Sequence, residues 1–219
     1  MSIIDTKYNM TQEQNVFFAN RNMAEYVFNI AKLEDCNVTI VETKMILSGE
    51  NVGHLSLRDI QKVLNLKGTW SYMLASFGSE FDLDYMSKIN IQVFRNESFE
   101  GGKLRTKKAK PHHRTSYIPE IPVKEEVEAK IAQLLSLESV LAGAIKLFLW
   151  MYKSQIFTDG NKRTGLICAN RRLIETGEGI LTVKDTLTKE FSDRLEKFCD
   201  TDDTSIEQWI YDHCIIGFK

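Results

Sequence analysis

The amino-acid sequence predicts an all-α fold. Helix breakers are scarce, because the 219 residues include only three prolines, all between Pro111 and Pro122, and proline is the residue that most strongly disrupts a helix interior. On either side of these prolines, apolar residues recur at three- and four-residue intervals rather than in alternation, which indicates helices and not strands. The length suits one domain, or one domain with an appended arm.

In the N-terminal half, apolar stripes predict a series of helices. The first stripe includes Phe17, Tyr26 and Ile30 and is typical of a helix with one buried face. Ser56 is a good N-cap, and Asp59 three residues later makes an imperfect capping box. The mixed pattern of 82–94 favours a helix. The expected helices cover 12–31, 38–47, 56–64, 68–77 and 82–94.

The pattern breaks between 96 and 122. Gly101 and Gly102 open this segment and the prolines close it, so it is predicted to form either a loop or an exposed hairpin. A basic loop is usually solvated and mobile, whereas a hairpin edge can pair with an extended target segment. Its basic residues accumulate without an acid between them: Lys103, Arg105, Lys107, Lys108, Lys110 and Arg114.

In the C-terminal half, the segment 136–154 is apolar nearly all round. Such a helix belongs in the middle of a bundle. The next helix ends at Gly177, because glycine is the usual residue just beyond a helix C-terminus. The expected helices here cover 124–135, 136–154, 162–176, 185–198 and 205–215.

Composition excludes several classes of function. Lys and Arg number 28 against 30 Asp and Glu, so no global field favours nucleic acid or an anionic membrane as the partner. The four cysteines are scattered singly, which predicts reduced, buried thiols and no zinc site or disulfide framework. The polar residues 1–10 do not form a signal peptide, and no run is long enough to span a membrane. We therefore expect a cytoplasmic protein without a membrane partner.

The segment from Gln155 to Gly165, QIFTDGNKRTG, joins the buried helix to the next one. Asp159 and Gly160 let the backbone turn tightly. The first free N–H groups of the following helix then point back into the turn, where they and the helix dipole favour an anion. The segment is predicted to form a cradle for phosphate.

The side chains of this turn add to the prediction. Asn161 can cap the helix and donate to an oxygen, Lys162 supplies a point charge, and Arg163 supplies a planar fork for two phosphate oxygens. The carboxylate of Asp159 can hold Mg²⁺ that also contacts phosphate oxygens. The alternative is an ordinary Asp-Gly-Asn turn followed by solvated basic residues.

From Gln155 through Arg163 the sequence resembles the Fic motif, His-Pro-Phe-x-Asp/Glu-Gly-Asn-Gly/Lys-Arg-x-x-Arg. A weaker resemblance extends from about 41 to 177. It implies a Fic-fold helical bundle with a small β-hairpin flap at about 102–119. It divides the chain into an N-terminal helical arm, 1–35, and a Fic/Doc-like domain, 36–219, with the motif at 155–165.

The resemblance also implies roles for individual residues. Phe157 would be a core anchor, Asp159 the Mg²⁺ ligand, and Gln155, Asp159 and Arg163 the catalytic positions. The residues that would hold the phosphates of ATP are Gly160, Asn161, Lys162 and Arg163. The implied partners are ATP with Mg²⁺, a target protein whose Ser, Thr or Tyr hydroxyl docks at the flap, and, if the chain is a toxin, an antitoxin.

Fic proteins mostly transfer AMP to a hydroxyl of a target protein, whereas Doc proteins transfer a phosphoryl group. Lys162 stands where Doc has lysine, and Leu166 replaces the closing arginine of the motif. Both positions favour the Doc reaction, and Gly160 favours the Fic reaction. The choice between AMP and phosphoryl transfer stays open.

Gln155 occupies the position of the histidine that serves as general base. A carboxamide cannot accept a proton, and loss of a general base typically costs about 10²- to 10⁴-fold in rate. Phosphoryl-type transfer relies mainly on positioning and charge stabilisation, so slow chemistry could survive. The chain is thus either a weakened transferase or an inactive nucleotide- or partner-binding module of this fold. His112 and His113, which a flap could bring close, are the only substitute bases we consider.

Many Fic proteins restrain themselves with a helix carrying Ser/Thr-x-x-x-Glu-Gly/Asn, whose glutamate pairs with the closing arginine. The best-aligned stretch here, 43–48, has Leu47 at the glutamate position, and Glu50 is preceded by Ile46 where Ser or Thr belongs. Leu166 also removes the arginine partner. Self-inhibition of this kind is therefore predicted to be absent.

Overall fold

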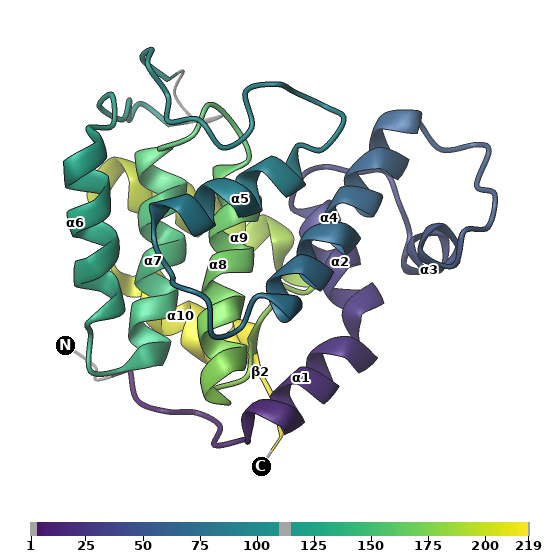
Figure 1. Cartoon of the computed structure of the whole chain (residues 1–219), viewed down its shortest axis with the longest axis horizontal. Coiled ribbons are helices and arrows are strands. Elements are labelled where there is room, and N and C mark those ends of the chain that lie inside the picture. Colours follow the sequence, from purple (N-terminus) through teal and green to yellow (C-terminus); the bar gives the residue numbers. More distant parts are fainter. Residues whose placement is uncertain (1–3, 110–114, 219) are drawn as a thin grey trace.

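The computed structural model describes residues 4–109 and 115–218, and it confirms the predicted all-α fold (Figure 1). Two short strands and a 3-10 helix, η1 (Asp185–Leu187), accompany the α-helices. The strands β1 (Ile180–Leu181) and β2 (Ile215–Ile216) pair antiparallel, with Ile180 opposite Ile216. The α-helices of the described residues are α1 (Gln12–Arg21), α2 (Met23–Lys32), α3 (Ile40–Ser48), α4 (Leu57–Ala75), α5 (Leu83–Val93), α6 (Lys124–Leu135), α7 (Val140–Ser154), α8 (Asn161–Thr176), α9 (Thr188–Thr201) and α10 (Ser205–Cys214).

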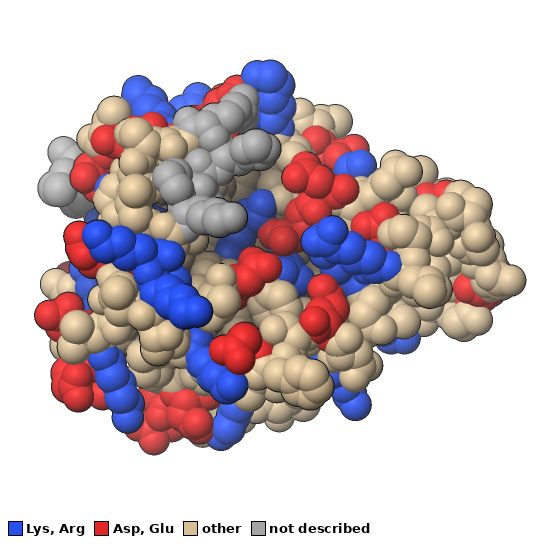
Figure 2. All heavy atoms as spheres, turned by 90° about the horizontal axis from the view of Figure 1, so that it is seen from above, with Lys and Arg blue, Asp and Glu red and all other residues tan. Residues whose placement is uncertain are grey.

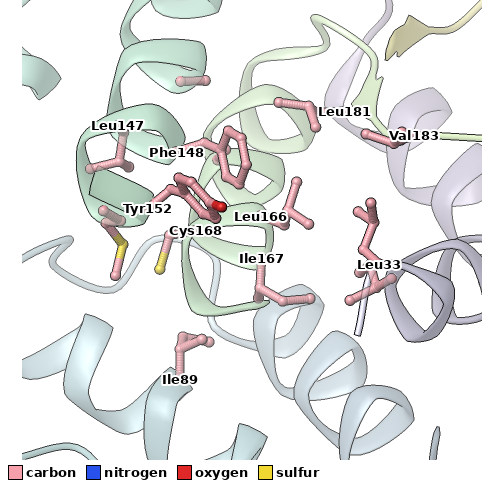
Figure 3. Packing of buried hydrophobic residues seen from close by; sticks show 14 of the residues in the cluster. Leu33, Ile89, Leu147, Phe148, Tyr152, Leu166, Ile167, Cys168, Leu181 and Val183 are labelled. Carbon is pink, nitrogen blue, oxygen red and sulfur yellow. The ribbon is translucent and has the colours of Figure 1, made fainter. Parts of the chain in front are cut away.

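Helix α8 runs through the middle of the bundle, between α7 and α5 (Figure 1). Gly165 lets α7 and α8 approach closely, because a Cβ there would already lie 3.3 Å from the ring of Phe148. Leu166 and Ile167 are almost fully buried and lie among side chains from several elements, including Ile89 of α5 (Figure 3). Each such side chain stabilises the fold by roughly 1.5–3 kcal/mol. The core therefore fixes α8, and with it the turn at its N-terminus.

Two helix boundaries differ from the prediction. The expected helix 12–31 is broken at Asn22, whose side chain donates to the carbonyl of Phe18 at 3.0 Å and offers the backbone an alternative to continuing the helix. The expected helices 56–64 and 68–77 are one helix, α4. Packing of its buried face outweighs the roughly 1 kcal/mol that Gly68 costs in a helix interior.

The described part of 102–119 contains no pair of hairpin strands, and the only sheet among the described residues is β1–β2. Leu104 forms a single antiparallel bridge with Phe157. The buried side chain of Arg105 holds the segment where a hairpin would have backbone hydrogen bonds between strands. Its guanidinium donates to the carbonyls of Gln155, Lys107 and Glu120 at 2.6–2.8 Å. The segment is thus an extended loop tied to the motif turn. His112 and His113 lie outside the described residues.

All four cysteines are free and buried, as predicted. Burial raises the pKa of Cys36 to about 11 and the pKa of both Cys199 and Cys214 to about 12. These thiols stay protonated at neutral pH and are poor nucleophiles. None of the described helices combines the length and apolar character needed to cross a membrane.

The division into an arm, 1–35, and a domain, 36–219, stays a prediction. Helix α1 packs against α8, and α2 packs against α3 and α4. Side chains of α2 such as Tyr26 and Val27 belong to the same buried cluster as α8. Residues before α1 are also attached, because the amide of Met10 donates to the carbonyl of Gly177 at 3.0 Å.

Next to this attachment, Glu178 is buried and its Oε2 has no hydrogen-bond partner. Burial raises the pKa of Glu178 by disfavouring the carboxylate, and Asp5 adds to the shift. A raised folded-state pKa means that stability is lost as the pH rises through that pKa. We predict that Glu178→Gln increases the free energy of unfolding at neutral pH by roughly 1 kcal/mol.

Urea denaturation measures this effect. The gain should disappear below pH 4.5, the usual glutamate pKa, because Glu178 is then neutral in both states. Glu138→Gln, at an exposed glutamate, should change stability little at either pH. A gain that persists at low pH would contradict the titration argument.

Candidate functional site

The turn between α7 and α8 is set by Gln155, the C-cap of α7. Its backbone is left-handed, with φ 44° and ψ 55°, a conformation that costs a residue other than glycine some free energy. Two hydrogen bonds hold it: the amide of Gln155 donates to the carbonyl of Met151 at 3.2 Å, and its carbonyl accepts from Arg105 Nε at 2.8 Å. The chain is thereby turned toward the start of α8.

Asn161 closes the turn. Its Oδ1 accepts from the amide of Phe157 and its Nδ2 donates to the carbonyl of Phe157, both at 2.9 Å. The ring of Phe157 is fully buried. The side chain of Asn161 is therefore committed to the turn, so only its backbone amide is available to a ligand. Sequence reasoning had assigned the side chain to an oxygen of the ligand.

Gly160 is required by both conformation and space. Its φ is +71°, and a Cβ there would lie 2.5 Å from Cε2 of Phe94. The fully buried Asn90 fixes the backbone on either side, since its Nδ2 donates to the carbonyl of Asp159 at 3.1 Å and to Thr164 Oγ1 at 2.9 Å. The cradle is rigid.

The backbone amides of Asn161, Lys162 and Arg163 donate to no acceptor among the described residues. They are the free amides that a helix N-terminus offers to an anion. The carboxylate of Asp159 is exposed, and its Oδ1 accepts from the amide of Gly160 at 2.5 Å. An exposed carboxylate is accessible to a hard cation such as Mg²⁺.

Above these amides lies a groove of ≈ 450 Å³. Four of the predicted site residues besides Gly160 line it: Gln155, Asp159, Asn161 and Lys162. Two polar atoms in its wall, Gln155 Nε2 and Thr188 Oγ1, are buried without a hydrogen-bond partner. Unsatisfied buried polar atoms in the wall of a groove are expected where a ligand or water completes the hydrogen bonding.

The opposite wall of the groove comes from α9. Thr188, Ser192 and Glu196 line it, and their four-residue spacing places them on one face of the helix. Sequence reasoning missed these residues. The signal was present as a polar stripe beside the apolar face of Phe191 and Leu195, but nothing local connects that stripe to the motif turn.

Arg163 does not line the groove. Its side chain is 3% exposed and lies over the ring of Phe94, with 4.8 Å from Cζ to the centroid. Its Nε lies 3.2 Å from Oε2 of Glu34, an ion pair without hydrogen-bond geometry. Lys162 Nζ lies 3.3 Å from Oε1 of the same carboxylate and also donates to the carbonyl of Leu33. One carboxylate is thus paired with both predicted phosphate-binding cations.

The segment 43–51, which lacks the inhibitory motif, supplies no acid to the motif turn. Glu50 is exposed and its carboxylate accepts from Ser48 Oγ, while Leu166 is buried in the core. The acid that reaches the motif is Glu34, just beyond the C-terminus of α2. An acid is electrostatically unfavourable at that end of a helix, which was the only hint of its role in the sequence.

These features define an α-helical domain in which a buried helix, a glycine turn and a second helix form an anion cradle. Residues 80–173 match the Fic/DOC family. This match covers the motif and agrees with the family that the motif resembles. No match was found among curated proteins.

Several solved structures share the fold. Fic-1 (aa134 - 508) from C. elegans superposes with a TM-score of 0.75 at 20% identity over 89% of this chain. A Fic domain containing signaling protein from Bacteroides thetaiotaomicron gives 0.72 at 15% identity, covering 92% of this chain and 84% of that one. A Fic family protein from Desulfovibrio desulfuricans gives 0.67 at 16%, over 92% of this chain and 62% of the other. The present chain spans 62% of the C. elegans chain.

We predict that Asn161→Ala destabilises the protein by about 2 kcal/mol, because it removes both hydrogen bonds to Phe157 and leaves buried backbone groups unsatisfied. Thermal and urea denaturation would measure the loss. The control is Thr158→Ala in the same turn, whose side chain is exposed and whose loss should change stability by less than about 0.5 kcal/mol. Equal effects of the two variants would show that the Asn161 clamp is not what holds the turn.

Proposed function

We propose that the chain binds a Mg²⁺-complexed nucleoside triphosphate, with ATP as the expected ligand, in the groove between the N-terminus of α8 and α9. We further propose that it transfers AMP, or a phosphoryl group, to a hydroxyl of a target protein. The observation that carries the proposal is the set of three free amides at 161–163, at the closed end of a groove with unsatisfied polar walls.

The residues present fit the ion and the nucleotide. Asp159 would hold Mg²⁺ through its exposed oxygen, and the ion, when bound, would neutralise charge on phosphate oxygens. The cradle amides would bind the phosphates. The face of α9 with Thr188, Ser192 and Glu196 offers hydroxyl and carboxylate partners to the ribose and base. The groove is lined by residues of both the cradle and α9.

In AMP transfer the target oxygen bonds to the α-phosphorus, the bond to the β-phosphate bridge oxygen breaks, and pyrophosphate leaves. In phosphoryl transfer the same oxygen bonds to the γ-phosphorus and ADP leaves. The hydroxyl proton must go to solvent in either case, because Gln155 cannot accept it. The free Nε2 of Gln155 can only orient an oxygen by donating a hydrogen bond, which makes transfer slow.

Glu34 restrains the site as it stands. A polyphosphate needs the charges of Lys162 and Arg163, and both are paired with this carboxylate. Binding therefore requires Glu34 to leave, so the apparent affinity is reduced by the fraction of molecules in which it is paired. The other acids of the groove, among them Asp35, make the binding of a metal-free nucleotide still less favourable.

The second candidate is a nucleotide-binding module without catalysis. Two observations favour it. Gln155 replaces the general base, and Arg163 is buried against the ring of Phe94. Such a module would use the ligand to set the position of Glu34 and α2. Both candidates need the groove, so nucleotide binding is the first property to test.

We predict that Glu34→Gln raises the affinity for Mg²⁺–ATP about tenfold, because it frees Lys162 and Arg163. Isothermal titration calorimetry with and without Mg²⁺ would measure it. Asp35→Asn is the matched control: it removes one negative charge from the same groove without breaking an ion pair to the cradle. Equal gains for the two variants would mean that overall charge, not the Glu34 ion pairs, limits binding.

Activity is tested with ATP labelled at the α or the γ phosphate, incubated with cell lysate. The Glu34→Gln variant should transfer the label slowly, and Glu34→Gln combined with Gln155→His should transfer it about 10²-fold faster, because it regains a base. The labelled position decides between AMP and phosphoryl transfer. Nucleotide binding without label transfer in any variant would establish the module, and no binding in any variant would overturn both candidates.

A further inference from the structure

A second recess lies on the other side of the motif turn. It has a volume of ≈ 670 Å³ and is bounded by the N-terminus of α4, the C-terminus of α5 and the loop that follows α5. We call it the α4–α5 recess. Thr158 and Asp159 line both this recess and the nucleotide groove. A molecule seated in the recess would therefore lie next to the proposed position of the phosphates.

One large apolar side chain lies in the wall of the recess, and another lies in the loop that lines it. Leu57, in the wall, is 85% exposed, and Phe99, between the lining residues Ser98 and Glu100, is 98% exposed. Single exposed apolar residues are ordinary. A partner that covered both side chains would remove their apolar surface from water.

The loop that carries Phe99 is held in place. Asn65 Nδ2 donates to the carbonyl of Arg95 at 2.9 Å and to Glu97 Oε1 at 2.7 Å. At the other end the amide of Gly102 donates to Asn90 Oδ1 at 2.8 Å. Both asparagines are buried. The loop is thus fixed before a partner arrives, which lowers the entropic cost of binding.

The charge of the recess is negative. Among the described residues, Glu97, Glu100 and Asp159 line it, with Arg58 as the one cation. Lys103 contacts Glu100 at 3.4 Å, but this pair is exposed and such pairs are weak. Figure 2 shows acidic side chains near the middle of the view, with basic side chains among them. This charge complements a basic partner.

We propose that the α4–α5 recess docks a segment of the target protein in which Lys or Arg stands beside a large apolar side chain. The proposal rests on the proposed function in that the docked protein is the acceptor of the transferred group. The apolar side chain contacts Leu57 and Phe99, and the basic one contacts Glu97 and Glu100.

Fluorescence polarisation with two short labelled peptides tests the docking in the absence of nucleotide. Both peptides contain the same serine, leucine and phenylalanine, and the remaining positions are Lys and Arg in one, and Asp and Glu in the other. We expect only the basic peptide to bind, and binding should weaken as salt is added because the charges are exposed. Phe99→Ala should weaken it about tenfold, as should Glu97→Lys combined with Glu100→Lys.

Phe17→Ala is the matched control, since Phe17 is 63% exposed on α1, and it should leave binding unchanged. Circular dichroism and thermal denaturation check that the exposed substitutions leave the fold intact. Equal binding of both peptides, or binding insensitive to Phe99 and the two glutamates, would overturn the proposal. So would self-association that Phe99→Ala abolishes, because the occupant would then be a second copy.

The peptide measurement and the nucleotide titration test different proposals, so a negative result in one does not decide the other. The peptides are measured without ATP, and the titration uses the groove residues on the other side of Asp159. Loss of peptide binding with intact nucleotide binding removes the docking surface alone. Peptide binding without any nucleotide binding keeps the surface and removes the transferase.

Discussion

Burial of the α7–α8 pair is the constraint on which the site depends. Gly165 allows the two helices to pack closely, and the apolar surroundings of α8 leave it no freedom to shift. The turn at its N-terminus is then closed by Asn161 on the backbone of Phe157. Amides held in this way can meet a negative charge without reorganisation, which is what makes a preorganised site effective. The cradle is thus a consequence of the core.

The charged side chains around the cradle differ from its backbone amides, because they already have partners. Lys162 and Arg163 are placed by α8, and both are paired with Glu34, which follows the C-terminus of α2. Arg163 is additionally covered by its own contact with Phe94. A paired and buried guanidinium is costly to expose, since breaking the pair leaves a charge without a partner. The backbone amides at 161–163 are free, whereas the charged side chains of Lys162 and Arg163 are paired.

The parts of the fold that depend on neighbouring residues could be predicted from the sequence. The glycine turn, the free amides and the apolar helix before them are local patterns, and the structure has them where the sequence placed them. Glu34 could not be predicted, because its contact with residues 162–163 joins segments far apart in the chain. The polar stripe of α9 was missed for the same reason. The break at Asn22 was local, but an asparagine inside an apolar stripe is compatible with either outcome.

The side chain of Asn90 joins the two sides of the motif turn through hydrogen bonds. Its Oδ1 accepts from the loop that carries Phe99, and its Nδ2 donates to the carbonyl of Asp159 and to the hydroxyl of Thr164 in α8. All three bonds are made by one fully buried amide, so none can lengthen without loss of a buried hydrogen bond. The distance between the loop that carries Phe99 and the carbonyl of Asp159 is therefore held by a single side chain. In the proposed transferase, this is the distance that brings a docked hydroxyl to the phosphate, and misplacement by even an ångström reduces the rate strongly.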